Sequence, residues 1–126
     1  MRPALFAVLA VATATILALP TPAAAWRASN GLPVRDMGAG QIEVVARPGM
    51  SAAMAFCAAG EYARRMQGVS AETRLWRASP SPRRSGESMV FTSTPTANPG
   101  KTGVFMLTDD DGSMTVGFAS VLCDHP

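Results

Sequence analysis

A single amphipathic segment, residues 47–68, limits the folds open to this chain. At about 100° per residue, one side of a helical wheel collects small and apolar side chains, namely Ala52, Ala55, Phe56, Ala59, Tyr62, Ala63 and Met66. The other side carries Glu61, Arg64 and Arg65. Ser51 is a candidate N-cap, and Pro48-Gly49 and Gly68 are typical of the two ends of a helix. The pattern predicts one long helix that lays its alanine-rich side on a sheet.

Residues 1–25 have the pattern of a secretory signal peptide. Arg2 precedes an apolar run from Ala4 to Leu19, and the segment ends on Ala23-Ala24-Ala25, a small-residue cleavage site. A membrane anchor is the alternative, but the run is shorter than the roughly 20 residues that a span needs. We therefore expect cleavage after Ala25 and a soluble periplasmic or secreted protein without a membrane span.

The remaining residues suffice for one small domain. Residues 26–40 are rich in glycine and turn residues, which predicts an irregular N-terminal arm, and residues 41–126 form the single domain. A core of this size leaves little room for a buried cofactor, so none is expected. The whole chain has 11 Lys and Arg against 9 Asp and Glu without a basic stripe, which argues against nucleic-acid binding.

The chain has two cysteines, Cys57 and Cys123. In an exported protein the pair predicts one disulfide, because oxidising compartments favour disulfides over free thiols. A redox or nucleophilic thiol is the alternative, but the Cys-x-x-Cys spacing of such sites is missing. On the wheel Cys57 lies on the flank of the helix, so the segment 122–124 is expected to run along that flank and to be clamped there.

The strand pattern predicts an α+β fold of two layers. Alternation and β-branched residues indicate about five strands, at residues 41–47, 73–78, 88–94, 103–108 and 114–123. With the helix after the first strand, the element order is β-α-β-β-β-β. The last four strands are expected to form an antiparallel meander, with a tight hairpin turn at Asp111-Gly112.

Residues that carry chemistry form no convincing site. The acids lie mostly at turns or on the polar side of the helix, and the lone histidine, His125, is next to the C-terminus. Asp109, Asp111 and Ser113 have the alternating oxygen spacing of a calcium loop, but a bidentate glutamate does not follow where such a loop needs it. The sequence therefore favours a turn over a metal site and predicts neither catalytic residues nor a metal.

Both faces of the predicted sheet are apolar. The helix side is expected to hold Ile42, Leu75, Phe91, Phe105, Val116 and Phe118, and the opposite side Val45, Arg74, Trp76, Val90, Met106 and Ala119. An apolar second face needs a cover, either the N-terminal arm, the curled sheet itself, a protein partner or a second copy of the chain. The alternative, Trp76 in the core with the opposite register, stays open.

A mixture of arginines and Trp76 is the candidate interaction surface. It comprises Arg74, Trp76, Arg77, Arg83 and Arg84, a combination found at the centres of protein interfaces. We therefore expect a non-catalytic binding or interaction module with an unknown protein partner. A structural, envelope-associated protein is the alternative, and an enzyme with an unidentified active site is the weakest hypothesis.

Overall fold

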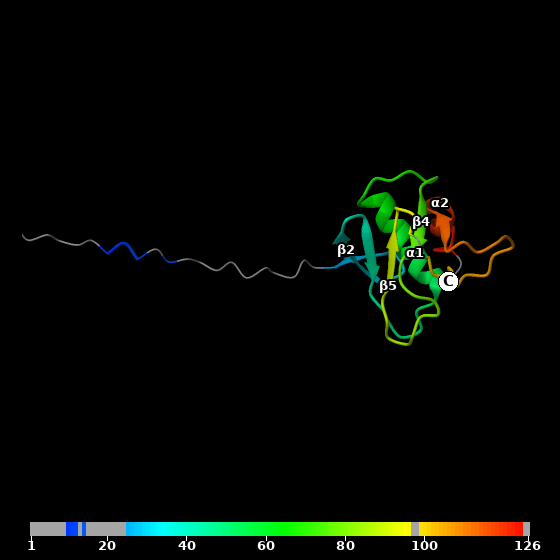
Figure 1. Cartoon of the computed structure of the whole chain (residues 1–126), viewed down its shortest axis with the longest axis horizontal. Coiled ribbons are helices and arrows are strands. Elements are labelled where there is room, and N and C mark those ends of the chain that lie inside the picture. Colours follow the sequence, from blue (N-terminus) through cyan, green and yellow to red (C-terminus); the bar gives the residue numbers. More distant parts are fainter. Residues whose placement is uncertain (1–9, 13, 15–24, 97–98, 125–126) are drawn as a thin grey trace, which may run out of the picture.

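The computed structural model describes residues 10–12, 14, 25–96 and 99–124 (Figure 1). Most of the predicted signal peptide, and His125, lie outside these residues. No helix in the described part of the chain combines the length and the apolar character needed to cross a membrane.

One antiparallel sheet and two helices make up the domain. The strands are β1 (Trp26–Arg27), β2 (Pro33–Gly38), β3 (Gln41–Val44), β4 (Arg74–Arg77), β5 (Met89–Thr92) and β6 (Ser113–Thr115). They lie in the order β1-β2-β3-β5-β4-β6, and each neighbouring pair is antiparallel. The helices are α1 (Ala52–Arg65) and α2 (Val116–Val121). The predicted α+β class, with one main helix on an antiparallel sheet, is confirmed.

Helix α1 begins at the predicted cap. The Ser51 Oγ accepts a hydrogen bond from the Met54 N–H at 3.1 Å, which satisfies one of the unpaired donors of the first turn. On the sheet side Phe56 meets Phe91 with ring centroids 4.7 Å apart. Met66, predicted on the apolar side, caps the end of the helix and is exposed. Glu61, predicted on the polar side, is buried.

Residues 26–40, where an irregular arm was expected, contain β1 and β2. β2 pairs with β3 through a tight turn at Gly38, Ala39 and Gly40, which all have positive φ. Glycine adopts positive φ without steric cost, so this turn lets the chain reverse within three residues. The other end of the segment is fixed because Trp26 stacks edge-on against Tyr62 at 5.5 Å. The glycines therefore mark a hairpin turn inside an ordered segment.

The C-terminal third corrects the predicted strands. Residues 103–108 form no strand, and the predicted strand 114–123 is the short β6 followed by α2. The Thr115 Oγ1 accepts from the Phe118 N–H at 3.1 Å and so caps a helix where β-branched residues had suggested a strand. Because β6 pairs with β4, the predicted meander and the hairpin at Asp111-Gly112 are both wrong.

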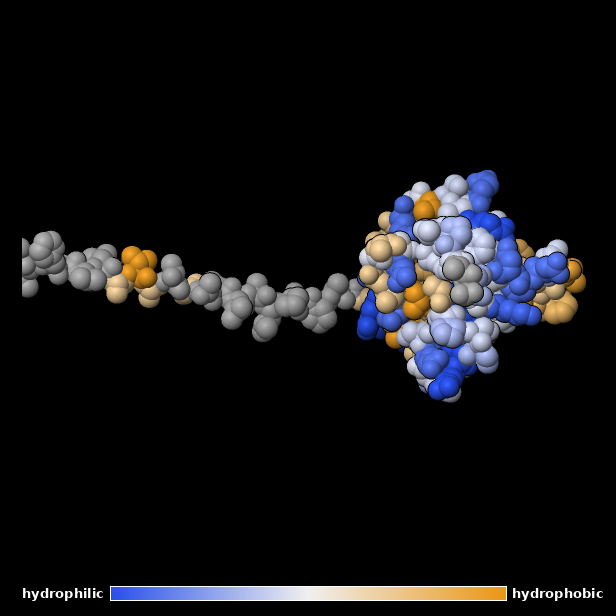
Figure 2. Space-filling view, viewed as in Figure 1, coloured by the Kyte–Doolittle hydropathy of each residue, from blue (hydrophilic) through white to orange (hydrophobic). Residues whose placement is uncertain are grey.

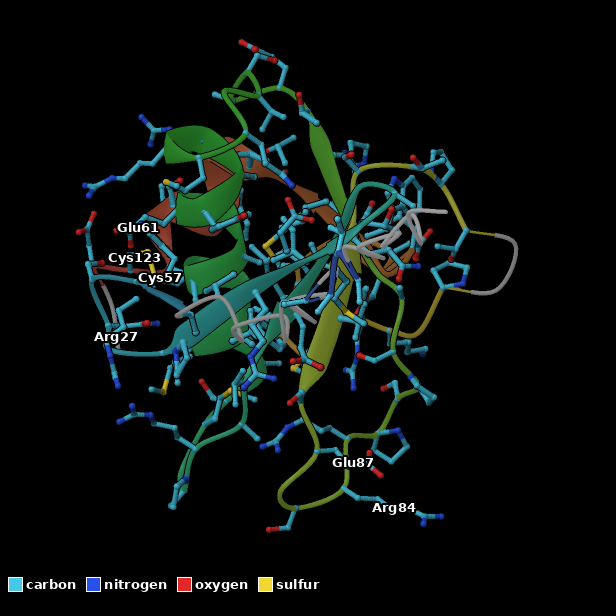
Figure 3. All side chains as sticks on the ribbon, turned by 90° about the vertical axis from the view of Figure 1, so that its left-hand side faces the viewer. Arg27, Cys57, Glu61, Arg84, Glu87 and Cys123 are labelled. Carbon is cyan, nitrogen blue, oxygen red and sulfur yellow. A yellow bond between two sulfur atoms is a disulfide. The ribbon has the colours of Figure 1, made fainter. Side chains whose placement is uncertain are left out.

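Helix α2 covers the side of α1 that the sheet does not. The two helices lie side by side (Figures 1 and 3), and a Cβ at Gly60 would come within 2.8 Å of the Ala119 Cβ. This close approach requires glycine at position 60. It also explains why α1 is buried on both sides, Glu61 and Cys57 included.

The assignment of sheet faces is right for the strands and wrong for the C-terminal part. Ile42, Leu75 and Phe91 are buried in the core as predicted, and so is Val116. Phe105 and Phe118, predicted beside them, are exposed, and Ala119, placed on the opposite face, is buried. Strand alternation puts Trp76 on the face opposite Leu75, where it is half-buried.

Candidate functional site

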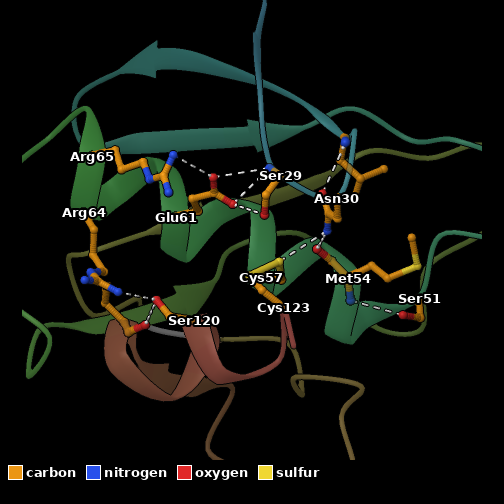
Figure 4. The surroundings of a disulfide bond; sticks show 12 residues. Ser29, Asn30, Ser51, Met54, Cys57, Glu61, Arg64, Arg65, Ser120 and Cys123 are labelled. Atoms are coloured by element: carbon orange, nitrogen blue, oxygen red, sulfur yellow. Dashed lines mark hydrogen bonds and ion pairs between the residues drawn. A yellow bond between two sulfur atoms is a disulfide. The ribbon is translucent and has the colours of Figure 1, made fainter. Parts of the chain in front are cut away.

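A polar cleft of about 570 Å³ lies beside the disulfide, between the chain that follows β1 and the two helices (Figure 4). Its lining includes Ser29, Glu61, Arg64, Arg65, Ser120 and Asp124. The cleft thus contains two guanidinium groups and two carboxylates, those of Arg64, Arg65, Glu61 and Asp124. The cleft is the first candidate for a binding site.

The polar groups of this cleft already bind one another. The Glu61 carboxylate accepts from the Ser29 N–H at 3.0 Å and from the Ser29 hydroxyl at 2.6 Å, and it pairs with Arg65 at 3.5 Å. Arg64 donates to the Ser120 Oγ at 3.4 Å. Buried charge needs such partners to offset its desolvation. We interpret the cleft as a junction that ties the N-terminal segment and α2 to α1.

The predicted disulfide between Cys57 and Cys123 is confirmed, with its Cα atoms 5.0 Å apart. It joins α1 to the segment after α2, so the expected clamp on the flank of α1 starts from a helix and not from a strand. Glu61 has its carboxylate within 4.8 Å of both sulfur atoms. The sulfur atoms are bonded to each other and offer no thiolate, the form that binds metals and acts as nucleophile.

The second candidate binding site is on a loop that projects from the domain on the side opposite β2 (Figure 1). We call residues 99–112 the presenting loop. Arg77, the last residue of β4, fixes its base: one terminal nitrogen donates to the carbonyls of Lys101 at 3.0 Å and Thr102 at 3.4 Å. The other donates to the Pro80 carbonyl at 2.7 Å. Arg77 is only 2% exposed, and the backbone carbonyls that accept from it offset part of the cost of removing its charge from water.

Thr102 and Asp110 close the base of the presenting loop. The Asp110 carboxylate accepts from the Thr102 N–H at 3.1 Å and from the Thr102 hydroxyl at 2.8 Å. It also accepts from the Gly112 N–H at 3.0 Å. Thr102 is fully buried, which shields these charge-assisted bonds from water. The two ends of the loop are therefore held together.

The two ends of the loop also touch through their backbones. Gly112 has a φ of +83°, and a Cβ at this position would collide with the carbonyl of Gly100. Only glycine permits both the backbone conformation and this approach. The following residue is fixed by Asp111, whose carboxylate accepts from the Ser113 N–H at 3.0 Å and the Ser113 hydroxyl at 2.7 Å. The carboxylates predicted to form a turn thus bind their own loop.

Asp110 makes the loop base sensitive to acid. Burial raises the pKa of Asp110, but the hydrogen bonds from Thr102 and Gly112 and the charge of Lys101 outweigh burial and leave the pKa below its usual range. A folded-state pKa below the unfolded-state value gives stability that is present above the unfolded-state pKa. This stability is lost as the pH falls through the folded-state pKa.

Asp110→Asn is expected to lower the free energy of unfolding at neutral pH by about 1–3 kcal/mol, because an amide accepts these bonds less well than a carboxylate. The loss of stability on acidification below about pH 4 should become shallower in the variant. Urea titrations of both proteins between neutral and acidic pH measure this. Equal stabilities at neutral pH would show that Asp110 does not hold the loop.

The tip of the presenting loop exposes large apolar side chains. Phe105 is 88% exposed and Leu107 is 95% exposed, and we call these two residues the apolar tip. Figure 2 shows hydrophobic residues at the projecting end of the molecule, directly beside hydrophilic ones. Such side chains gain nothing from folding, because they stay in water.

A groove of about 630 Å³ lies between the apolar tip and α2. Its lining is largely apolar and comprises Arg74, Phe105, Met106, Leu107, Thr108, Met114, Thr115 and Phe118. Phe118, on α2, is 46% exposed and lines the groove together with the tip. The apolar tip, the groove and the fixed base of the presenting loop together form the candidate binding site.

The chain matches no protein-family model, no curated protein and no solved structure.

The structure separates the five residues of the predicted interaction surface. Arg74 is exposed, pairs with Asp111 at 3.6 Å and lines the groove. Arg77, predicted at the surface, is buried and holds the loop base, because the alternation of side chains along β4 places it on the core side of the sheet.

The other three residues of the predicted surface lie away from the groove lining. Arg83 donates to the Met50 carbonyl at 2.7 Å and to the Glu87 carbonyl at 3.0 Å. Arg84 points into solvent beside Glu87 (Figure 3), and Trp76 lies half-buried on β4.

Sequence reasoning missed the residues that matter most at this site. Phe105 and Phe118 were assigned to the core, and Leu107 to a strand. Thr102 had no assigned role, and Asp110 was assigned only to the predicted turn. The run Pro99-Gly100 before an apolar stretch and Asp110 after it is a signal that could have indicated a closed loop, since turn residues stand at both ends.

Proposed function

We propose that this protein is an exported, non-catalytic binding module that captures a protein partner with its apolar tip. The observation that carries the proposal is the exposure of Phe105 and Leu107 at the end of a loop whose base is fixed. Apolar side chains displayed in this way are typical of interaction sites.

The fixed base supports binding rather than disorder. Arg77, Thr102 and Asp110 hold the two ends of the presenting loop, so its tip loses less conformational freedom when a partner binds. The groove beside Phe118 offers a place where a partner side chain exchanges water for apolar contacts. The exposure of the apolar tip and the fixed conformation of the loop base together favour an interaction module over a purely structural envelope protein.

Export is part of the proposal. The leader pattern of residues 1–25 and the Cys57–Cys123 disulfide both fit a periplasmic or secreted protein, since disulfides persist in oxidising compartments. In the polar cleft, Glu61 is already bound by Ser29 and Arg65, which favours a structural role over a catalytic one.

Site-specific photo-crosslinking in the producing cells tests the proposal. A benzophenone side chain at position 105 is expected to give one discrete adduct with a partner protein. The same side chain at position 37 is the matched control, because Met37 is also apolar and 51% exposed but lies on β2. No adduct at position 105, or the same adduct from position 37, would contradict the proposal.

A further inference from the structure

We propose that the Cys57–Cys123 disulfide of the folded protein exchanges with external thiols through one of its two sulfur atoms. Cys123 is the sulfur that an external thiolate attacks, and Cys57 is the sulfur that leaves. The reaction takes place at the polar cleft beside the disulfide, and its substrate is a thiol that enters this cleft. The inference does not depend on the apolar tip.

The two cysteines differ in access from solvent. Cys57 lies within α1 and is 1% exposed. Cys123 is half-buried and lines the polar cleft. A thiolate attacks a disulfide sulfur in line with the bond that breaks, so the rate of exchange depends on access to the sulfur that is attacked. The buried sulfur of Cys57 offers no such path, whereas the sulfur of Cys123 is approached from the cleft.

Asn30 prepares Cys57 as the leaving group. The Asn30 Nδ2 donates to the Met54 carbonyl at 2.9 Å and to the Cys57 Sγ at 3.4 Å (Figure 4). The Asn30 Oδ1 accepts from the Leu32 N–H at 3.2 Å, which fixes the orientation of the amide. A donor aimed at the sulfur where negative charge develops stabilises the departing thiolate. The carboxylate of Glu61 lies near both sulfur atoms and does not decide between them.

The size of the cleft limits the thiol more than its charge does. Arg64 and Arg65 balance Glu61 and Asp124 in the lining, so the cleft selects neither an anionic nor a cationic thiol. Its volume of about 570 Å³ lies within the range of about 300–1,000 Å³ that is typical of small-molecule sites. The cleft therefore has room for a thiol of tripeptide size or for the reactive cysteine of a protein.

The exchange has two steps that balance. In the first, an external thiolate forms a bond to the Cys123 sulfur, and the electron pair of the broken bond leaves with the Cys57 sulfur, which takes a proton from water. In the second, another external thiolate attacks the external sulfur of this mixed disulfide and releases Cys123 as a thiolate. Two external thiols are oxidised to one disulfide, and the two cysteines are reduced. Reoxidation of the folded protein reverses these steps, so Cys123 again carries the external group and Cys57 displaces it.

The position of the mixed disulfide tests the inference, with reduced glutathione as the first probe. The folded protein is treated with glutathione, quenched with iodoacetamide and digested with trypsin, which separates the two cysteines because Arg64 and Arg65 lie between them. We expect glutathione on Cys123 and the alkyl group on Cys57, in at least about tenfold excess over the reverse arrangement. In urea, where both sulfur atoms are exposed, the two arrangements should differ by less than about threefold.

Three results would overturn the inference. They are glutathione on Cys57 of the folded protein, the same distribution in the folded and unfolded protein, and no adduct on the folded protein at a thiol concentration that opens the bond in urea.

A protein thiol is the second probe and distinguishes the two sources of the thiolate. The reagent is a Cys-x-x-Cys oxidoreductase whose second cysteine is changed to serine, so that the mixed disulfide accumulates. An adduct on Cys123 with both probes assigns the cleft to thiols of either size, and an adduct with glutathione alone assigns it to small thiols. An adduct of the oxidoreductase on Cys57 would contradict the assigned order of attack.

Asn30→Asp tests the role of the donor. The substitution keeps the Oδ1 that accepts from Leu32, but it removes the N–H that reaches Cys57 and places a carboxylate beside the leaving sulfur. The rate constant for attack by glutathione should fall about fivefold or more. If Asn30 served only to hold the chain in place, its loss would loosen the cleft and speed the reaction, so an unchanged or higher rate contradicts this role. Gln41→Glu, the same amide-to-acid change at an exposed position on β3, should leave the rate unchanged.

Discussion

Reduction of the Cys57–Cys123 disulfide should lower the free energy of unfolding by about 4 kcal/mol. The bond closes a loop with a sequence separation of 66, and a crosslink of this length removes much entropy from the unfolded chain. The total stability of a domain of this size is only about 5–15 kcal/mol. Chemical denaturation of the oxidised protein and of a Cys57→Ala, Cys123→Ala variant measures the difference.

The position of the bond adds a second expectation. Because it anchors the segment after α2 to α1, hydrogen exchange should quicken first in α2 when the bond is removed. Exchange in β3 and β5, at the centre of the sheet, should change least. A midpoint of unfolding that does not move, or two titratable thiols in the untreated denatured protein, would refute the account of the disulfide.

Arg77→Met should cost about 3 kcal/mol of stability and release the presenting loop. The substitution keeps an apolar stem of similar length, but it leaves the carbonyls of Lys101, Thr102 and Pro80 without the donors they have now. The tip residues themselves stay unchanged. Loss of partner binding in this variant would therefore arise from loss of preorganisation.

Arg84→Met is the matched control for Arg77→Met. Arg84 is exposed, so its loss should change the free energy of unfolding by less than about 0.5 kcal/mol. Hydrogen exchange across residues 99–112 should rise in Arg77→Met and remain as in the natural protein in Arg84→Met. Equal effects of the two substitutions would mean that the buried guanidinium does not hold the loop.

Local patterns in the sequence predict the centre of the fold well. The cap at Ser51, the alanine-rich side of α1 and the alternation of β3, β4 and β5 all depend on neighbours in sequence, which a helical wheel or a strand pattern captures. The disulfide was predictable because only two cysteines are present. These elements determine the fold class and the position of the core.

The C-terminal third depends on distant contacts and was not predictable in the same way. The run from Met114 to Cys123 alternates like a strand, yet Val116 and Ala119 are buried one helical turn apart because α1 offers Gly60 as a place for α2 to pack. Glu61 was assigned to solvent because the residue that it binds, Ser29, lies 32 residues away in the sequence. Tertiary packing overrides local preference in both cases.

The candidate site was missed for a related reason. Large apolar residues usually lie in a core, so the sequence alone places Phe105 on the core side of the sheet and Leu107 in a strand. An arginine next to a tryptophan, such as Arg77, suggests a surface until the backbone carbonyls that it binds are known. Only the three-dimensional structure shows that Arg77 is internal and the apolar tip external.

The yield of the photo-crosslinked adduct from position 105, compared among three chains in the producing cells, tests the central claim most directly. The chains are the natural sequence, Leu107→Asp and Arg84→Asp, with the last as the control for an added acid at an exposed position. We predict one adduct in the natural sequence and in Arg84→Asp, and its loss in Leu107→Asp. An adduct that persists undiminished in Leu107→Asp would contradict the claim that the apolar tip binds the partner.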